Sequence, residues 1–177
     1  MVLRPLTLAD EAAFLRGYED YAGENPAQYT FTWKPGMSFA QHVQQLDDHA
    51  RGLNVPAEWV PSTMLYAFAG ARIVGRVSIR HTLNDYLRRR GGHVGYSVAP
   101  PYRRKGFATL MLRLALDPCR ALGLEKIMLT CDDDNIASVK VIEKNGGVLA
   151  ETFRDKESRT LTRRYWIDLG PLVHEKD

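Results

Sequence analysis

The sequence predicts a single domain of the α/β (α+β) class, spanning residues 1–177. Two kinds of hydrophobic pattern carry this prediction. Short segments of alternating or continuous apolar residues indicate strands, and longer segments with apolar residues three and four positions apart indicate helices. The two patterns are interspersed along the chain without a break in composition, an internal repeat or a low-complexity run. We therefore expect one hydrophobic core and a largely antiparallel first half.

The first eighty residues contain three strand patterns and two helix patterns. Thr7 and Ser38 are suitable N-cap residues, and Gly70-Ala71 separates the last two strand patterns as a hairpin turn would. The segment between the two helices, residues 23–37, is polar, aromatic and proline-containing and predicts a long loop. We expect elements at Val2–Arg4, Leu8–Tyr21, Phe39–Ala50, Met64–Ala69 and Arg72–Arg80.

The second half continues the alternation of helices and strands. Gly91-Gly92 and Gly146-Gly147 mark ends of elements, and Pro118 predicts a kink because it removes one backbone donor from its helix. We expect a helical turn at Leu83–Arg90, helices at Phe107–Leu122 and Ile136–Asn145, and strands at His93–Val98, Lys126–Cys131, Val148–Phe153 and Thr160–Leu169.

The composition is that of a globular protein with no marked charge. Hydrophobic residues make up 45% of the chain and charged residues 25%, and the formal net charge is +3. The two cysteines, Cys119 and Cys131, show no metal-ligand spacing and predict neither a zinc site nor a disulfide framework. No secretion signal or membrane-spanning run is recognisable. We expect a cytoplasmic protein that does not contact membranes.

The segment from Val98 to Thr109 is the strongest candidate binding site. A strand passes through two prolines into a basic turn that opens a helix, whose first N–H groups lack intrahelical partners and attract anions. Gly106 and Ala108 would let a phosphate approach the backbone closely. Three basic side chains, Arg103-Arg104-Lys105, would add charge-assisted hydrogen bonds. The alternative is an ordinary basic turn before a surface helix.

The spacing Arg103-x-x-Gly106-x-Ala108 resembles the cofactor motif of the GNAT family, acyltransferases that use acetyl-CoA. A second segment, Asn135-x-x-Ser138 followed by residues 143–147 (Glu-Lys-Asn-Gly-Gly), is similar to that family's second cofactor segment. Residues 91–98 also resemble a bacterial subgroup of acetyltransferases that is poorly characterised. The resemblance covers about residues 72–166, and it implies a GNAT fold: a mixed, mostly antiparallel sheet, splayed between the fourth and fifth strands and flanked by helices.

The resemblance implies an N-acetyltransferase in which an amine acceptor attacks the acetyl group directly, in a ternary complex with acetyl-CoA and without a metal. Main-chain atoms of Tyr96 and Val98 would pair with the pantetheine arm, and the N–H groups of residues 104–109 would surround the pyrophosphate. The N–H near Val98 would also polarise the acetyl carbonyl. The implied cofactor-binding residues are Tyr96, Ser97, Val98, Arg103, Arg104, Lys105, Gly106, Phe107, Ala108, Thr109, Asn135 and Ser138.

The catalytic groups depart from the family pattern. No carboxylate stands near Gly92, where many members place a glutamate, and Ile142 replaces the frequent tyrosine acid. His93 is the nearest candidate base, although a histidine there could equally serve as a hydrogen-bonding group of the sheet. Ser138 is a candidate acid for the leaving thiolate. Tyr96, Tyr165 and water are alternatives.

Other features allow more than one interpretation. The run Asp132-Asp133-Asp134 complements a helix N-terminus better than it builds a metal site, and Cys131 lacks a paired histidine that would make it a nucleophile. Tyr29, Phe31 and Trp33 would either line the pocket of a small-molecule or peptide acceptor or pack in the core.

Two alternative functions and the possibility of a homodimer stay open. The missing glutamate and tyrosine would suit a non-catalytic acyl-CoA sensor. The arginines at residues 88–90 would suit an RNA-binding module, although the near-balanced charge makes nucleic acid an unlikely partner. A homodimer is possible.

Overall fold

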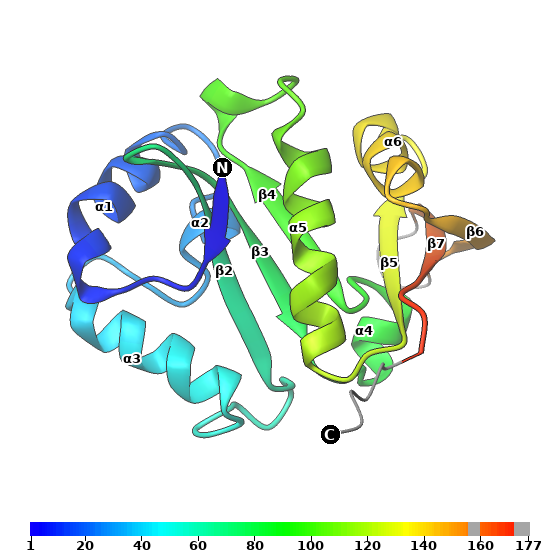
Figure 1. The fold of residues 1–177 in the computed structure, drawn as a ribbon, viewed down its shortest axis with the longest axis horizontal. Coiled ribbons are helices and arrows are strands. Elements are labelled where there is room, and N and C mark those ends of the chain that lie inside the picture. Colours follow the sequence, from blue (N-terminus) through cyan, green and yellow to red (C-terminus); the bar gives the residue numbers. More distant parts are fainter. Residues whose placement is uncertain (156–159, 172–177) are drawn as a thin grey trace, which may run out of the picture.

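The structure is a computed structural model that describes residues 1–155 and 160–171. It contains strands and helices in alternation, as the hydrophobic patterns predicted (Figure 1). The strands are β1 (Val2–Arg4), β2 (Ser62–Ala69), β3 (Arg72–Arg80), β4 (Val94–Val98), β5 (Lys126–Asp132), β6 (Val148–Arg154) and β7 (Leu161–Asp168). The α-helices are α1 (Glu11–Glu19), α2 (Ala27–Thr30), α3 (Phe39–Ala50), α4 (Asp85–Arg89), α5 (Phe107–Ala121) and α6 (Ile136–Lys144).

The strands form two antiparallel sheets, with orders β1-β2-β3-β4 and β5-β7-β6. β2 and β3 are the expected hairpin, with Ser62 opposite Arg80 and a bulge at Ala67/Phe68. The last strand, β7, lies between β5 and β6 and pairs with both. β4 and β5 lie side by side and both run toward the upper end of the molecule in Figure 1. This confirms the expected mixed α/β fold with a splay between the fourth and fifth strands.

Helices cover the first sheet on both faces. Helix α5 lies in front of the sheet in Figure 1 and buries Met111, Leu112 and Ala115 against Val77 and Ile79 of β3. On the opposite face, a second cluster packs aromatic rings from α1, α2 and α3 against β2. Tyr29, which could have lined a pocket, is fully buried in this second cluster.

Several element boundaries differ from the expected ones. The first helix begins with a 3₁₀ turn, Leu8–Asp10, capped by Thr7, and α1 follows it. The expected loop at residues 23–37 contains the one-turn helix α2, whose Tyr29 hydroxyl donates to the Phe14 carbonyl. Burial of this tyrosine between aromatic neighbours stabilises the turn, and polar composition alone did not reveal it. Pro118 lies inside α5, which continues to Ala121.

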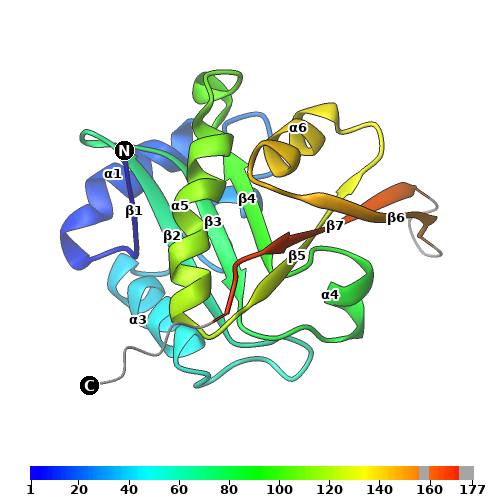
Figure 2. The same cartoon turned by 45° about the vertical axis from the view of Figure 1, so that its right-hand side comes forward.

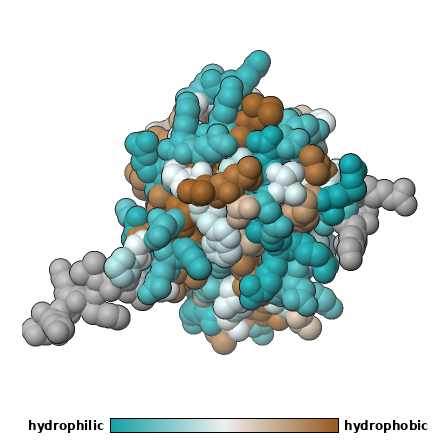
Figure 3. Space-filling view, turned by 90° about the vertical axis from the view of Figure 1, so that its right-hand side faces the viewer, coloured by the Kyte–Doolittle hydropathy of each residue, from teal (hydrophilic) through white to brown (hydrophobic). Residues whose placement is uncertain are grey.

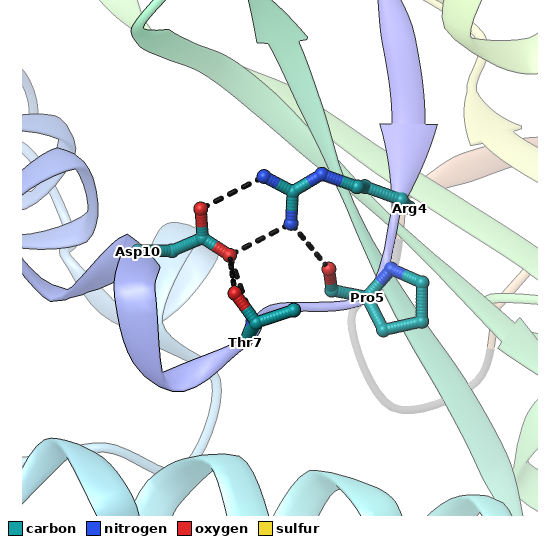
Figure 4. A network of polar contacts seen from close by, with 4 residues as sticks. All are labelled: Arg4, Pro5, Thr7 and Asp10. Atoms are coloured by element: carbon teal, nitrogen blue, oxygen red, sulfur yellow. Dashed lines mark hydrogen bonds and ion pairs between the residues drawn. The ribbon is translucent and has the colours of Figure 1, made fainter.

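A carboxylate network joins β1 to the first helix (Figure 4). Both oxygens of Asp10 accept from the Arg4 guanidinium, at 2.7 and 2.8 Å, and one of them also accepts from the Thr7 backbone and hydroxyl. Asp10 is only 8% exposed. These charged hydrogen bonds keep the pKa of Asp10 well below its usual value.

The face that carries α6 and β6 mixes hydrophilic and apolar groups (Figure 3). Most residues of the edge strand β6 are exposed, including Val148 and Leu149. Figure 2 shows this strand at the outside of the smaller sheet. The possible homodimer stays a prediction. Among the described residues, none of the helices has the length and apolar character needed to cross a bilayer.

Candidate functional site

The two sheets are hydrogen-bonded to each other at the start of β4, and the candidate site opens beside this junction. The His93 N–H donates to the Met128 carbonyl at 2.7 Å, Gly91 donates to the Thr130 hydroxyl, and Gly92 forms an isolated bridge with Leu129. Beyond these contacts the strand pairings join β4 to β3 and β5 to β7, and none joins β4 to β5. The strands therefore separate toward the N-terminus of α5.

The free edge of β4 carries the backbone groups that the motif pointed to. The His93 carbonyl accepts from the backbone N–H of Arg80 in β3, and the Ala99 N–H donates to the Val74 carbonyl of the same strand. In an antiparallel pair, the N–H and C=O of one residue point to the same side and alternate along the strand. The backbone groups of Tyr96 and Val98 therefore point away from β3, toward the gap beside β5.

A cavity of about 160 Å³ occupies the gap between β4 and β5. It is lined by residues of both strands and of α6, among them Gly95, Tyr96, Leu129 and Ser138. A neighbouring cavity of about 240 Å³ shares Ser138 and Thr130 and includes Asn135. Together the two cavities form a slot that an extended chain of atoms can enter.

The turn before α5 presents unpaired backbone donors at the upper end of this slot. The N–H groups of Phe107, Ala108 and Thr109 have no intrahelical partner, and Gly106 provides no side-chain cap. Gly106 has φ +84°, and a Cβ built there would meet nothing within 4 Å. Arg104 also has positive φ, at 60°. The turn thus exposes its donors to open space, which is the arrangement that a pyrophosphate requires.

Two of the three basic side chains of this turn, those of Arg103 and Lys105, already have partners within the chain. The Arg103 guanidinium forms a two-point ion pair with Glu24, at 2.7 Å for each contact, and its Nε donates to the Val98 carbonyl. Lys105 donates to the Pro101 carbonyl at 2.8 Å. Each of these groups would have to exchange its partner to contact a phosphate, so the backbone donors are the readier ligands.

The second motif places a helix cap and a hydroxyl at the slot. The Asn135 side chain accepts from the Ser138 N–H at 3.0 Å, which is the N-cap geometry of α6. Burial raises the pKa of Tyr96 to about 12, and its buried hydroxyl has no hydrogen-bond partner among the described residues. Ser97 points to the other face of the sheet, where its hydroxyl lies 2.8 Å from that of Tyr21.

His93 is part of the junction between the sheets. Its Nδ1 accepts from the Met128 N–H at 2.9 Å, and its ring lies 6.4 Å from that of Trp166. Burial, together with Arg88 and Arg80, lowers the pKa of His93 to about 4. The imidazole is therefore neutral at pH 7, and because Nδ1 accepts the hydrogen bond from Met128, Nε2 carries the ring proton.

A larger cavity, of about 450 Å³, lies beside the slot on the face opposite α5. Phe31 and Trp59, whose ring centroids are 5.0 Å apart, belong to its wall, as does Tyr86. Ser62, Ser78 and Arg80 line it from the sheet. Arg80 lines both this cavity and the slot, so the two spaces meet at its side chain.

The slot lies among segments that the sequence predicted to bind a cofactor, and that binding stays a prediction, whereas most residues of this second cavity were not predicted. Phe31 was a candidate for it; Trp59 and Arg80 were not. The signal available was the alternation of Arg76, Ser78 and Arg80 along one face of a strand, where three polar residues turn toward a helix-covered side. Such a pattern is unusual for a buried strand face and indicates a cavity.

The remaining candidates have structural partners. Asp133 binds Arg163 at 2.6 Å, and Asp132 binds Arg90 at 3.2 Å. Burial raises the pKa of Cys131 to about 11, which opposes a nucleophilic role. Within residues 1–155 and 160–171, no group of three or more histidine, cysteine or acidic side chains is placed to hold a metal ion.

Comparisons with known proteins agree with this arrangement. A family model described as an acetyltransferase (GNAT) domain matches residues 1–148. An acetyltransferase of the GNAT family from Streptococcus pneumoniae has a similar structure, with a TM-score of 0.62, 21% identity and coverage of 96% of this chain and 99% of that one.

Two further solved structures are similar over nearly their whole length. One is yncA from Salmonella typhimurium with its cofactor acetyl-CoA, with a TM-score of 0.61, 16% identity and coverage of 99% of this chain and 96% of that one. The other is a mutant of spermidine N-acetyltransferase SpeG from Vibrio cholerae, with a TM-score of 0.61, 20% identity and coverage of 100% of both chains. No curated protein sequence matches this chain.

Proposed function

Because the chain belongs to the GNAT acetyltransferase family, we propose that it transfers the acetyl group of acetyl-CoA directly to an amine acceptor, with both substrates bound together. The family establishes an acetyl-CoA-dependent N-acetyltransferase, and the ternary-complex mechanism and the residue roles are the proposed part. One observation carries the proposal: the gap between β4 and β5 holds a cavity lined by Tyr96, Ser138 and Arg80.

The residues of the turn and of β4 fit a phosphate-bearing thioester. The first-turn N–H groups of α5 would bind the pyrophosphate, and the backbone groups of Tyr96 and Val98 on the gap side would hold the pantetheine arm, the Val98 carbonyl after releasing the Arg103 Nε. When bound, acetyl-CoA supplies an activated acyl group. The Val98 N–H lies on the gap side of β4, where a preorganised donor to the acyl oxygen is worth about 3 kcal/mol in the transition state.

Binding of acetyl-CoA by isothermal titration calorimetry tests this arrangement. Gly106→Ala is the matched control, since it adds the backbone strain of a positive φ, about 1–2 kcal/mol, without charge. Gly106→Glu adds the same strain and a carboxylate, which would face the pyrophosphate at the same turn. We expect Gly106→Glu to abolish measurable binding and Gly106→Ala to weaken it modestly. Equal affinities in the two variants would refute the site.

Proton transfers complete the proposed reaction. An alkylammonium acceptor must lose a proton before it attacks, and we propose that the imidazole of His93 takes it, directly or through water. Nδ1 is the ring nitrogen without a proton, so its contact with the Met128 N–H must open when the imidazole accepts one. Ser138 lines both parts of the slot and is the proposed proton donor to the leaving thiolate.

A pair of variants separates the base role of His93 from its role in the sheet. In His93→Asn, the side-chain oxygen can still accept from the Met128 N–H, but the titrating ring is gone; His93→Ala removes both. If His93 is the base, turnover falls by about tenfold or more in both variants while acetyl-CoA binding persists. A His93→Asn enzyme with wild-type turnover would assign the base elsewhere and leave the histidine as a junction residue.

A further inference from the structure

Arg80 occupies the boundary between the slot and the cavity of about 450 Å³. Its Nη1 is within 3.3 Å of the Gly91 carbonyl and 3.4 Å of the Gly92 carbonyl, and both contacts are long for charged hydrogen bonds. Among residues 1–155 and 160–171, neither Nε nor Nη2 of Arg80 donates a hydrogen bond, and no carboxylate forms an ion pair with Arg80. The guanidinium therefore has unused donors beside a cavity.

The surroundings of Arg80 are built to accommodate it. A Cβ at Gly95 would lie 3.0 Å from Nη1 and 3.2 Å from Nη2, so a glycine on β4 leaves the space that the guanidinium fills. Burial lowers the pKa of Arg80 to about 10, which still leaves the group charged at neutral pH. A buried charge without an opposite charge is costly, and such a site stabilises any anion that reaches it.

Other charges near this site do not neutralise Arg80. Arg76 lies on the same face of β3 as Arg80, is also cationic and donates to the Gln28 carbonyl. Glu58, the acidic residue recorded in the cavity wall, is exposed and has no ion pair with Arg80 among the described residues. The floor of the cavity is thus positive, while its wall contains the rings of Phe31, Trp59 and Tyr86.

We propose, building on the acetyl transfer described above, that the acceptor is an α-amino acid whose free carboxylate binds Arg80 and whose apolar or aromatic side chain enters the cavity lined by Phe31, Trp59 and Tyr86. The position of Arg80 sets this class. It lines the slot as well as the cavity, so the anion that it binds lies next to the reacting amine. In an α-amino acid only one carbon separates the amine from the carboxylate.

Two other amine classes fit this site less well. A polyamine would bring a second cation close to Arg80, and the two like charges would repel each other. A peptide N-terminus replaces the carboxylate by a neutral amide and leaves the guanidinium without an anion. The guanidinium fork also matches the planar carboxylate in two-point geometry.

A matched substrate series tests the proposal. Rates of CoA thiol release at saturating acetyl-CoA are compared for L-phenylalanine, L-methionine and L-leucine, for their carboxamides, and for spermidine. We expect kcat/KM to be about tenfold or more higher for the acids than for the amides. Arg80→Met should abolish this preference for the acids and retain the affinity for acetyl-CoA. Arg80→Lys should retain part of the preference. Arg72→Met, at the exposed far end of β3, is the control and keeps the preference.

The outcomes separate this proposal from the proposed function. If amines are acetylated but amides or spermidine are used as well as the acids, the carboxylate site is wrong and acetyl transfer stands. If acetyl-CoA binds but no amine is acetylated, acetyl transfer fails. In that case, calorimetry with CoA present compares the binding of L-phenylalanine with that of its carboxamide. The carboxylate site is supported if only the acid binds and Arg80→Met abolishes this binding. Any other pattern overturns it.

Discussion

Gly92 tests whether the junction of the two sheets shapes the slot. It has φ +65°, and a Cβ there would lie 2.2 Å from the Met128 carbonyl oxygen and 2.8 Å from its carbon. Both are backbone atoms of β5, so no side chain can move aside to make room. In Gly92→Ala, β4 and β5 must separate by about 1 Å at the point where they are closest.

The expected cost follows from these contacts. Placing an L-residue at positive φ costs about 1–2 kcal/mol. Separation also weakens the hydrogen bonds that join His93 and Met128, of 2.7 and 2.9 Å, each worth about 1 kcal/mol. We therefore expect Gly92→Ala to lower the free energy of unfolding by about 3–4 kcal/mol. Gly123→Ala, at φ +79° with nothing within 4 Å, should cost only the backbone part.

Urea denaturation of both variants measures the difference. Native-state hydrogen exchange adds a local test, because the amides of His93 and Met128 should lose protection in Gly92→Ala and keep it in Gly123→Ala. The affinity for acetyl-CoA should fall in Gly92→Ala alone, since the slot begins at this junction. If the two variants are equally destabilised, the close approach of the strands at Gly92 contributes nothing and the reasoning is refuted.

Three further predictions concern charged and titratable groups. Asp10→Asn should lower the free energy of unfolding at pH 7 by about 2–3 kcal/mol, because it weakens the charged hydrogen bonds to Arg4. The pKa of Asp10 is lowered in the folded state, so its stabilising contribution fades as the pH falls below about 4. Urea titrations should therefore show a smaller difference between variant and wild type at pH 3 than at pH 7. His42 is fully buried, and burial lowers its pKa to about 4, so the unfolded state binds more protons between about pH 6.5 and pH 4. The wild type should therefore lose about 3 kcal/mol of stability through His42 as the pH falls across that range, and His42→Leu should not show this loss. A variant whose stability falls with pH as much as that of the wild type would contradict this. Glu24→Gln should leave the free energy of unfolding nearly unchanged, because the Arg103 pair is exposed to solvent, but should tighten acetyl-CoA binding in calorimetry if the released guanidinium contacts phosphate.

The cofactor side of the site could be predicted because it depends on local sequence. Pro100 and Pro101 end the strand pairing, Gly106 adopts the positive φ of an open turn, and Asn135 caps α6. Each of these features depends on residues within a few positions of one another. The role of Arg103 as a phosphate ligand stays a prediction, because Glu24, seventy-nine positions away, holds its guanidinium in the structure.

The acceptor side could not be predicted, because distant segments build it. Trp59 precedes β2, Tyr86 belongs to α4, and Arg80 ends β3, and only the packed sheet brings them around one cavity. The environment of His93 has the same origin. Its hydrogen bond to Met128 crosses between the two sheets, and sequence alternation placed the side chain on a face without showing its partner.

The sequence by itself determined which segments are strands and helices, where a turn opens the backbone before α5, and which family the chain resembles, because periodicity, capping and turn chemistry act over a few residues. The tertiary structure alone decided the position of β7 between β5 and β6, the neutral state of His93, and the position of Arg80 at the meeting of two cavities, with no opposite charge beside it among the described residues. These properties depend on burial and on contacts between residues far apart in the chain. The donor could therefore be inferred from local motifs, whereas the acceptor proposed here depends on packing.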